Sequence, residues 1–161
     1  MFPTGSSGNS FGVLWFFKKS FKIIEIQLDP PKSSEEKNKF QILESSLRKR
    51  VSLLEGLPVS VFDTVFNSIH LAPNAQKFIS ILQKNGILVG LVSGGFTPIV
   101  ERLAKFLSIS YFSANQLEVK DGLLTGTLVG QIISPQVKKE TLEKWREKLN
   151  LPKERTVAIG D

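Results

Sequence analysis

The stretch LVGLVSGGFTP, at residues 88–98, constrains the fold more than any other part of the chain. The apolar run that begins at Ile87 ends abruptly at Ser93-Gly94-Gly95, and Thr97-Pro98 follows. Glycine permits a tight turn, and a hydroxyl residue followed by proline is typical of a helix start. We therefore predict a buried strand over residues 87–92, a glycine turn, and a helix capped by Thr97 with Pro98 in its first turn.

Such a turn brings a hydroxyl and backbone N–H groups to the carboxyl end of a strand. Free N–H groups and the dipole of the following helix both favour an anion at that place. Ser93 and Gly94 are therefore candidates for holding a phosphate group. The spacing by itself fits equally well an ordinary turn between strand and helix that binds nothing.

Composition narrows the classes of function. The chain has 161 residues, which is single-domain size, no cysteine and one histidine, His70. The absence of cysteine excludes disulfides and thiolate chemistry, and it favours a reducing, cytoplasmic location. A single histidine disfavours a histidine-based catalytic triad. The net charge of +6 favours an anionic partner. Because basic and acidic residues are mixed in the C-terminal half, we expect a small anionic molecule and neither nucleic acid nor a membrane, with the oligomeric state left open.

Three segments are expected. Residues 1–33 are unassigned and partly disordered, with an apolar stretch at 11–17 too short to span a bilayer and a strand-like alternation at 21–28. Residues 34–69 have apolar positions at helical spacing, interrupted at Pro58, and predict a small helical cap.

Residues 70–161 alternate between helix and strand patterns. The predicted helices cover residues 74–85, 98–107 and 135–150, the last capped by Ser134. The predicted strands cover residues 87–92, 111–114, 128–133 and 156–160, with a hairpin over 117–127 that turns at Asp121-Gly122. This alternation favours an α/β fold, a parallel sheet covered by helices, in which ligands bind at the carboxyl ends of strands.

Three further charged residues carry chemical information. Lys138 falls in the first turn of a predicted helix, where a cation is disfavoured unless an anion lies nearby, although it could also extend into solvent. Asp161 follows an apolar strand, where a carboxylate suits either Mg²⁺ or a simple turn. Arg48 and Arg50 cannot share one helix face, so one of them could meet a ligand while the other stays solvated.

Several motifs together resemble the phosphoserine phosphatases of the haloacid dehalogenase superfamily. They occur in order as LRKRVSLL at 47–54, LVSGGF at 91–96, ANQLEVKDG at 114–122 with LTG at 124–126, VK at 137–138 and VAIGD at 157–161. The resemblance covers roughly residues 40–161. It implies a Rossmann-like core with a small helical cap, here truncated, and Mg²⁺-dependent hydrolysis of a phosphomonoester through an aspartyl-phosphate.

The resemblance also implies roles for particular residues. Ser93 and Gly94 would hold the transferring phosphoryl group, and Lys138, as a catalytic residue, would neutralise its charge. Asp161 would help to hold Mg²⁺. Arg50 would bind the substrate carboxylate as a two-pronged donor. The substrate implied is a phosphorylated amino acid, O-phospho-L-serine, and the reaction is the last step of serine biosynthesis.

The sequence departs from the family in one respect that concerns catalysis. The family's first motif, Asp-x-Asp-x-Thr/Ser, supplies the nucleophile, and no such motif occurs in this chain. Asp29 follows a strand-like run, but the residue two positions later is Pro31. The sequence also stops at Asp161, where the family continues. We therefore expect an incomplete chain with little or no activity of its own, or alternatively a catalytically dead module that binds phosphate or an amino acid.

Overall fold

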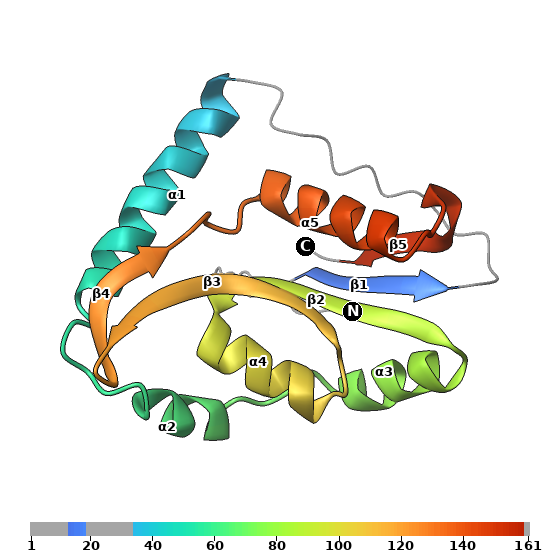
Figure 1. Ribbon diagram of the computed structural model, residues 1–161, viewed down its shortest axis with the longest axis horizontal. Helices are drawn as coiled ribbons and strands as arrows, with labels where there is room; N and C mark the ends of the chain where they lie inside the picture. The colour runs from blue at the N-terminus through green and yellow to red at the C-terminus, as the bar shows by residue number, and fades with distance from the viewer. Residues whose placement is uncertain (1–12, 19–33, 160–161) are drawn as a thin grey trace, which may run out of the picture.

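One mixed sheet organises the part of the chain that the structure describes. In this computed structural model, that part is residues 13–18 and 34–159, with side chains described from residue 40 onward. Five strands lie in the order β4-β3-β2-β1-β5 (Figure 1). The strands are β1 (Val13–Lys18), β2 (Ile87–Phe96), β3 (Tyr111–Lys120), β4 (Leu123–Val129) and β5 (Thr156–Ile159). The helices are α1 (Ser34–Ser52), α2 (Val61–Asn67), α3 (Ala75–Lys84), α4 (Thr97–Phe106) and α5 (Pro135–Lys148), with a 3₁₀ turn at Lys153–Arg155.

The α/β class predicted from the sequence is confirmed, but the sheet is not purely parallel. β2 and β3 pair in parallel, whereas β3 and β4 form an antiparallel hairpin. β1 lies between β2 and β5 and runs antiparallel to both. As a result β2 and β5 run in the same direction, as the sequence predicts, without being neighbours.

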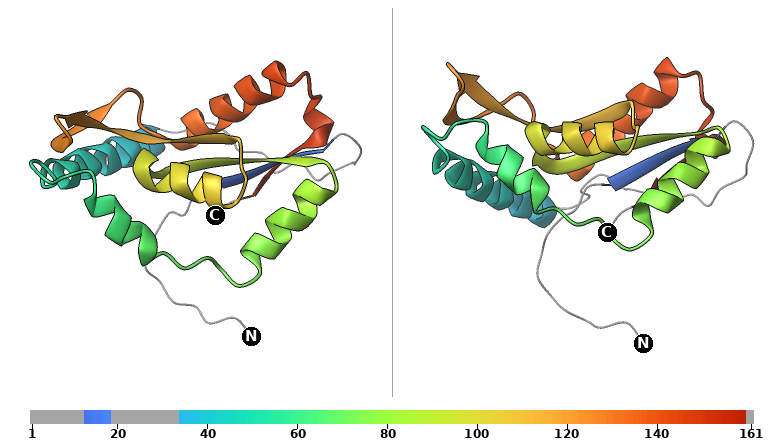
Figure 2. Two further views of the ribbon diagram at one scale, coloured as in Figure 1. Left: turned by 60° about the horizontal axis from the view of Figure 1, so that its bottom comes forward. Right: turned by 90° about the horizontal axis from the view of Figure 1, so that it is seen from below.

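Helices cover both faces of the sheet, so that the protein has three layers (Figures 1 and 2). α3 and α4 lie on one face and bury a cluster that includes Ile79, Val89 and Val100. α5 lies on the other face, where Leu142 and Trp145 pack against Val92. α1 packs beside β4 at the end of the sheet, around the buried Val51, Leu128 and Ile132.

Most helices match the pattern from which they were predicted. α1 and α2 fall within residues 34–69 and are separated around Pro58, as expected. α5 begins after Ser134, whose hydroxyl accepts a hydrogen bond from the Val137 N–H at 3.1 Å, so the predicted cap is confirmed. The predicted hairpin turn is also confirmed, since Asp121 and Gly122 both have positive φ, as a tight two-residue turn requires.

The predicted cap of α4 is wrong. The helix begins at Thr97, with Phe96 in the capping position and no side-chain cap. The Thr97 hydroxyl instead donates a hydrogen bond to the Asn115 carbonyl at 3.1 Å, because β2 continues past the glycines to pair Phe96 with Asn115. The glycine turn is therefore an irregularity within the last residues of β2, between Ser93 and Phe96.

Two predicted strands also need correction. The strand expected over residues 128–133 stops at Val129, the last residue of β4, because Gly130 adopts a left-handed conformation with φ 73°. The short strand at 111–114 and the first hairpin strand are in fact one strand, β3, which pairs with β2 in its first half and with β4 in its second. β1 and the 3₁₀ turn were not predicted as such, and the strand expected over residues 21–28 lies outside the described residues.

In the described part of the chain, no helix is both long and apolar enough to cross a membrane.

Candidate active site

The carboxyl ends of β2 and β5 lie at the same edge of the sheet. Leu14 of β1 faces Leu91 on one side and Ile159 on the other, so these two positions are level across the sheet. Ser93 comes two residues after Leu91 and is 9% exposed. Side chains that follow both strands are therefore brought to one edge, as expected for a ligand site in an α/β sheet.

Ser93 and Gly94 form the last part of β2 at this edge. The Ser93 hydroxyl accepts a hydrogen bond from the Gly95 N–H at 3.0 Å, which leaves its own hydrogen available to a ligand. A Cβ built on Gly94 would meet no atom within 4 Å, whereas one on Gly95 would lie 3.2 Å from the Ser93 hydroxyl. The space beside Gly94 is thus open.

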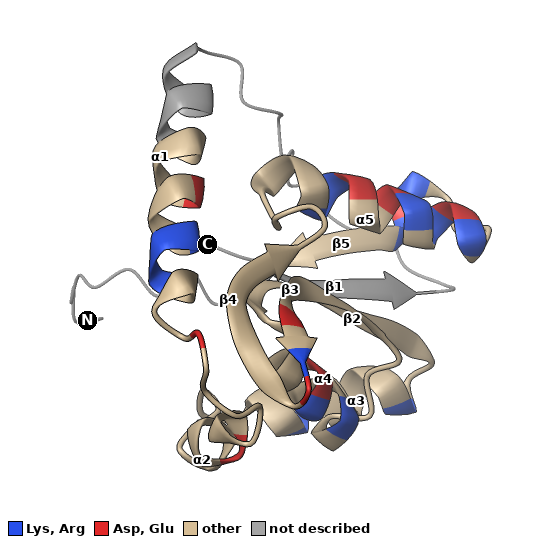
Figure 3. Ribbon diagram, turned by 60° about the vertical axis from the view of Figure 1, so that its left-hand side comes forward, with Lys and Arg blue, Asp and Glu red and all other residues tan. Residues whose placement is uncertain are grey.

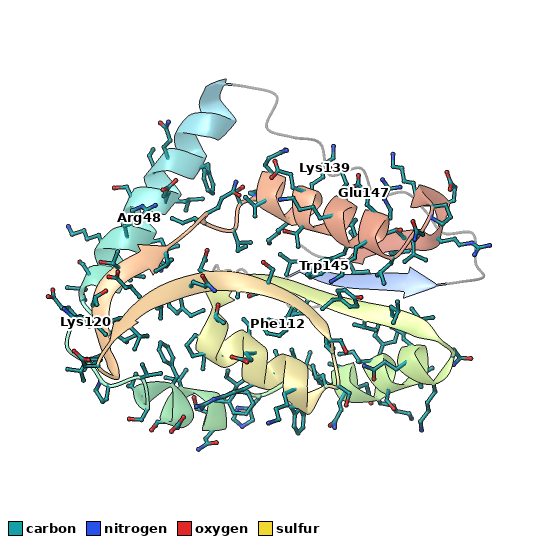
Figure 4. All side chains as sticks on the ribbon, viewed as in Figure 1. Arg48, Phe112, Lys120, Lys139, Trp145 and Glu147 are labelled. Atoms are coloured by element: carbon teal, nitrogen blue, oxygen red, sulfur yellow. The ribbon has the colours of Figure 1, made fainter. Side chains whose placement is uncertain are left out.

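Lys138 belongs to the first turn of α5. Its backbone N–H bonds to the Ser134 carbonyl at 2.9 Å, and its side chain is half-buried. Lys138 is four residues before Leu142 and seven before Trp145, and both of these pack against Val92, the residue before Ser93. Trp145 lies on the side of α5 that faces the sheet and Lys139 on the opposite side (Figure 4). Lys138 therefore begins the helical stripe that packs over the end of β2.

Arg50 lies on the last turn of α1 and differs from Arg48 in its surroundings. Arg48 forms an ion pair with Glu44 at 2.9 Å, one turn earlier on the same helix. Arg50 has an exposed side chain whose Nε donates to the Ser46 carbonyl at 3.4 Å. The ion pair with Glu44 engages the guanidinium of Arg48, whereas the hydrogen bond of Arg50 uses only its Nε. Of the two, Arg50 is therefore the one we expect to meet a ligand with its terminal nitrogens.

No metal site is complete within the described residues. Among the side chains that the structure describes, no group of three or more His, Asp or Glu residues could hold a metal ion. Asp161, the predicted metal ligand, lies outside those residues, as does Asp29. The described donors therefore do not by themselves fit Mg²⁺.

The direction of β1 matters for any nucleophile. Val13 pairs with Val92 and Lys18 pairs with Ile87, so the carboxyl end of β1 lies at the edge opposite Ser93. A carboxylate that directly followed β1 would therefore be far from the phosphate position.

Sequence reasoning did not single out Asn115 as a functional residue. This side chain is 2% exposed, donates to the Gly94 carbonyl at 2.7 Å and accepts from the Ile133 N–H at 2.8 Å. The sequence carried no clear signal for it, because Asn115 lies among other polar residues in the strand YFSANQLEVK, where it is the one buried position.

Two cavities lie beside this edge. One of about 350 Å³ lies between β3 and α5 and is lined partly by Ser113, Thr141 and Lys144. The other, of about 460 Å³, lies between α4 and the β3–β4 hairpin and includes Arg102 and Gln116. Neither is lined by Ser93 or Lys138, so both are neighbours of the candidate site and not part of it.

Comparison with known proteins places this chain in a family. Residues 38–161 match the sequence profile of the haloacid dehalogenase-like hydrolases. The chain belongs to this family.

The similar proteins narrow the resemblance further. The chain is 44% identical over 116 residues to phosphoserine phosphatase of Streptococcus thermophilus and 43% identical over 116 residues to that of Lactococcus lactis. Each alignment covers 72% of this chain and 54% of the relative, so the chain spans about half the length of these proteins.

Solved structures agree. A substrate-bound phosphoserine phosphatase complex is 35% identical, with a TM-score of 0.63 over 74% of this chain and 60% of that one. A phospho-aspartyl intermediate analogue of phosphoserine phosphatase is 36% identical, with a TM-score of 0.62 over 73% and 60%.

Proposed function

We propose that the protein carries the binding groups of a cytoplasmic phosphomonoester hydrolase for O-phospho-L-serine. Its full-length relatives would convert this compound and water into L-serine and phosphate, and the 161-residue chain itself would have little or no turnover. One observation carries the proposal. The Ser93-Gly94 edge and the Lys138 stripe of α5 lie within residues 38–161, which match the haloacid dehalogenase-like hydrolases, and the chain is 44% identical over 116 residues to a phosphoserine phosphatase. The proposed partner is accordingly a small phosphorylated amino acid.

Each proposed residue has a physical task. The Ser93 hydroxyl and the backbone at Gly94 would hold the phosphoryl oxygens, and the Lys138 ammonium would offset their negative charge. Phosphoryl transfer depends mostly on such positioning and charge neutralisation. The Arg50 guanidinium would bind the carboxylate of the substrate through two parallel hydrogen bonds.

Mg²⁺ is proposed as the cofactor, with Asp161 as one ligand. When bound, such an ion neutralises charge on the phosphate and orients it. Because the described residues contain no complete metal site, we assign no further ligand and no step to the metal.

A second candidate function is favoured by the direction of β1. Because the carboxyl end of β1 lies away from Ser93, β1 does not deliver a nucleophile to the proposed phosphate-binding edge. The protein would then bind phosphate or a phosphorylated amino acid without turning it over.

The test separates the two candidates. Release of phosphate from O-phospho-L-serine is measured with the purified chain, with and without Mg²⁺, beside calorimetric binding of the same compound. We expect binding with little or no turnover, because covalent catalysis needs a nucleophile that binding groups cannot replace. Slow, Mg²⁺-dependent release of phosphate supports the hydrolase, and binding with no release at all supports the binding module. Fast, Mg²⁺-dependent turnover that is lost in Asp29→Asn would contradict this and would make Asp29 the nucleophile.

A matched pair of variants tests the proposed role of Arg50. Arg50→Ala should weaken binding of O-phospho-L-serine about tenfold, since a charged hydrogen bond is lost, while leaving inorganic phosphate binding unchanged. Arg48→Ala, on the same helix, should change neither. Equal effects of the two variants would argue against a carboxylate contact at Arg50.

A further inference from the structure

Asn115 is the polar side chain most fully enclosed among the described residues. It is 2% exposed, compared with 9% for Ser93 and 8% for Ser134. Its amide uses both ends: Nδ2 donates to the Gly94 carbonyl at 2.7 Å, and Oδ1 accepts from the Ile133 N–H at 2.8 Å. A buried amide with both ends bonded fixes the distance between its two partners, because either bond alone would leave a buried polar group unsatisfied.

The two partners belong to the two halves of the candidate site. Gly94 lies at the end of β2 and is one of the proposed phosphate-binding residues. Ile133 precedes Ser134, whose hydroxyl caps α5 and whose carbonyl accepts the Lys138 N–H. One side chain of β3 thus connects the phosphate-binding backbone to the start of the helix that carries the proposed catalytic lysine.

The backbone of Asn115 adds a third connection. Its carbonyl accepts the Thr97 hydroxyl at 3.1 Å, at the first residue of α4. Asn115 pairs with Phe96 where the β2–β3 register shifts between Ser93 and Phe96. Regular strand pairing is interrupted there, so side-chain hydrogen bonds replace part of the ladder that would otherwise hold the glycine segment.

We propose that Asn115 is a positioning residue that holds the Ser93-Gly94 segment at a fixed distance from the first turn of α5. This inference rests on the proposed function, because it explains how the parts of that anion site are kept together. Asn115 acts through Gly94 and Ile133, and no contact with the substrate is assigned to it.

Two substitutions at Asn115 test the two hydrogen bonds of its amide separately. Asn115→Ala removes both hydrogen bonds. Asn115→Asp at neutral pH keeps an oxygen that accepts from the Ile133 N–H but removes the donor to the Gly94 carbonyl. Gln83→Ala is the matched control, because the Gln83 amide also donates to backbone carbonyls, those of Leu107 and Ser108, away from the site.

The readouts are binding of inorganic phosphate by calorimetry, amide hydrogen exchange by NMR, and urea unfolding. We expect both Asn115 variants to bind phosphate about tenfold more weakly than the wild-type chain, at a protein concentration and temperature where each is folded. Exchange of the Ile133 amide should accelerate in Asn115→Ala and stay slow in Asn115→Asp. Gln83→Ala should lower stability without changing either site-specific readout.

The outcomes distinguish this inference from the proposed function. Phosphate binding that is unchanged in Asn115→Ala overturns the inference and leaves the proposed function standing. Weakened binding only in Asn115→Asp also overturns it, since charge repulsion would then explain the effect. If the wild-type chain binds no phosphate, the proposed function fails, and amide hydrogen exchange then decides the inference. Exchange rates of the Ile133 and Gly95 amides in Asn115→Ala that equal those in Gln83→Ala would overturn the inference too.

Discussion

The edge of the sheet around Ser93 and the helical segment that carries Arg50 are held in place by different kinds of contact. At this edge, Asn115 donates to the Gly94 carbonyl and the Ser134 hydroxyl accepts from the Val137 N–H, and the two side chains are only 2% and 8% exposed. Residues 34–69 are attached by the packing of α1 against β4 and by the buried Phe62 of α2, whose ring contacts Phe96. The ion pair between Asp63 of α2 and Arg102 of α4 adds a contact in which both side chains are substantially exposed.

This difference has a functional meaning. Buried hydrogen bonds are costly to break and favour one geometry, which suits groups that must hold a phosphate. An exposed ion pair is weak, so the polar contact between α2 and α4 should contribute less than the buried hydrogen bonds at the strand ends. Charged side chains of both signs alternate along α5 (Figure 3). Under the proposed function, the phosphate-binding half is preorganised by buried hydrogen bonds, and the helix that carries Arg50 is positioned by apolar packing around Val51.

The largest expected effect concerns the place where β4 meets α1. Gly126 has φ 76°, and an added Cβ would lie 3.1 Å from the Cα and carbonyl oxygen of Ser52. Gly126→Ala should lower the free energy of unfolding by about 2 to 3 kcal/mol, because it combines an unfavourable backbone conformation with a steric clash. Urea denaturation measures the loss.

Gly122 provides the matched control in the same hairpin. It has φ 77°, but an added Cβ would meet no atom within 4 Å. Gly122→Ala should therefore cost only about 1 kcal/mol, from the backbone alone. Equal losses for the two variants would mean that the close approach of β4 to α1 contributes nothing, and the attachment of α1 would need another explanation.

An intermediate effect is expected at the start of α5. Ser134→Ala removes the hydroxyl that accepts the Val137 N–H, and should lower the free energy of unfolding by about 1 kcal/mol. Ser60 occupies the capping position of α2 but makes no side-chain cap hydrogen bond, so Ser60→Ala should have little effect. A larger loss at Ser60 would reverse the comparison between the two regions.

The smallest effect is expected at the ion pair of α2. A double-mutant cycle with Asp63→Asn and Arg102→Gln should give a coupling of about 0.5 kcal/mol or less, decreasing as salt is added. The pair of Glu44 and Arg48 on α1 gives a reference value for an exposed contact within one helix. A coupling well above 1 kcal/mol that is insensitive to salt would show that this polar contact contributes as much as the buried hydrogen bonds at the strand ends.

The sequence indicates elements whose signals are local. The strand at Ile87, the cap at Ser134 and the hairpin turn at Asp121 each depend on a few neighbouring residues, and all three are confirmed. Thr97 shows the limit of such reasoning. A hydroxyl before proline usually caps a helix, but here the Thr97 hydroxyl donates a hydrogen bond to the Asn115 carbonyl on β3. The role of Asn115 could not be predicted, because its partners are 18 and 21 residues away in the sequence.

Only part of the candidate site could be predicted from the sequence. The end of β2 and the first turn of α5 could be located from glycine, proline and hydroxyl positions. The direction of β1 could not be predicted from the sequence, because an apolar strand has the same pattern in either direction. Whether it pairs in parallel or antiparallel depends on its neighbours in the sheet. The roles assigned to Ser93, Lys138, Arg50 and Asp161 stay predictions.

The position of β1 between β2 and β5 also has a kinetic consequence. β5 pairs with β1, and β1 pairs with β2, so this strand joins the end of the described chain to the rest of the sheet. Leu14 must meet both Leu91 and Ile159, which are distant from it in sequence. Contacts over such separations close large loops and form slowly. The chain should therefore assemble its β2–β3–β4 portion first, and β5 should join the sheet last.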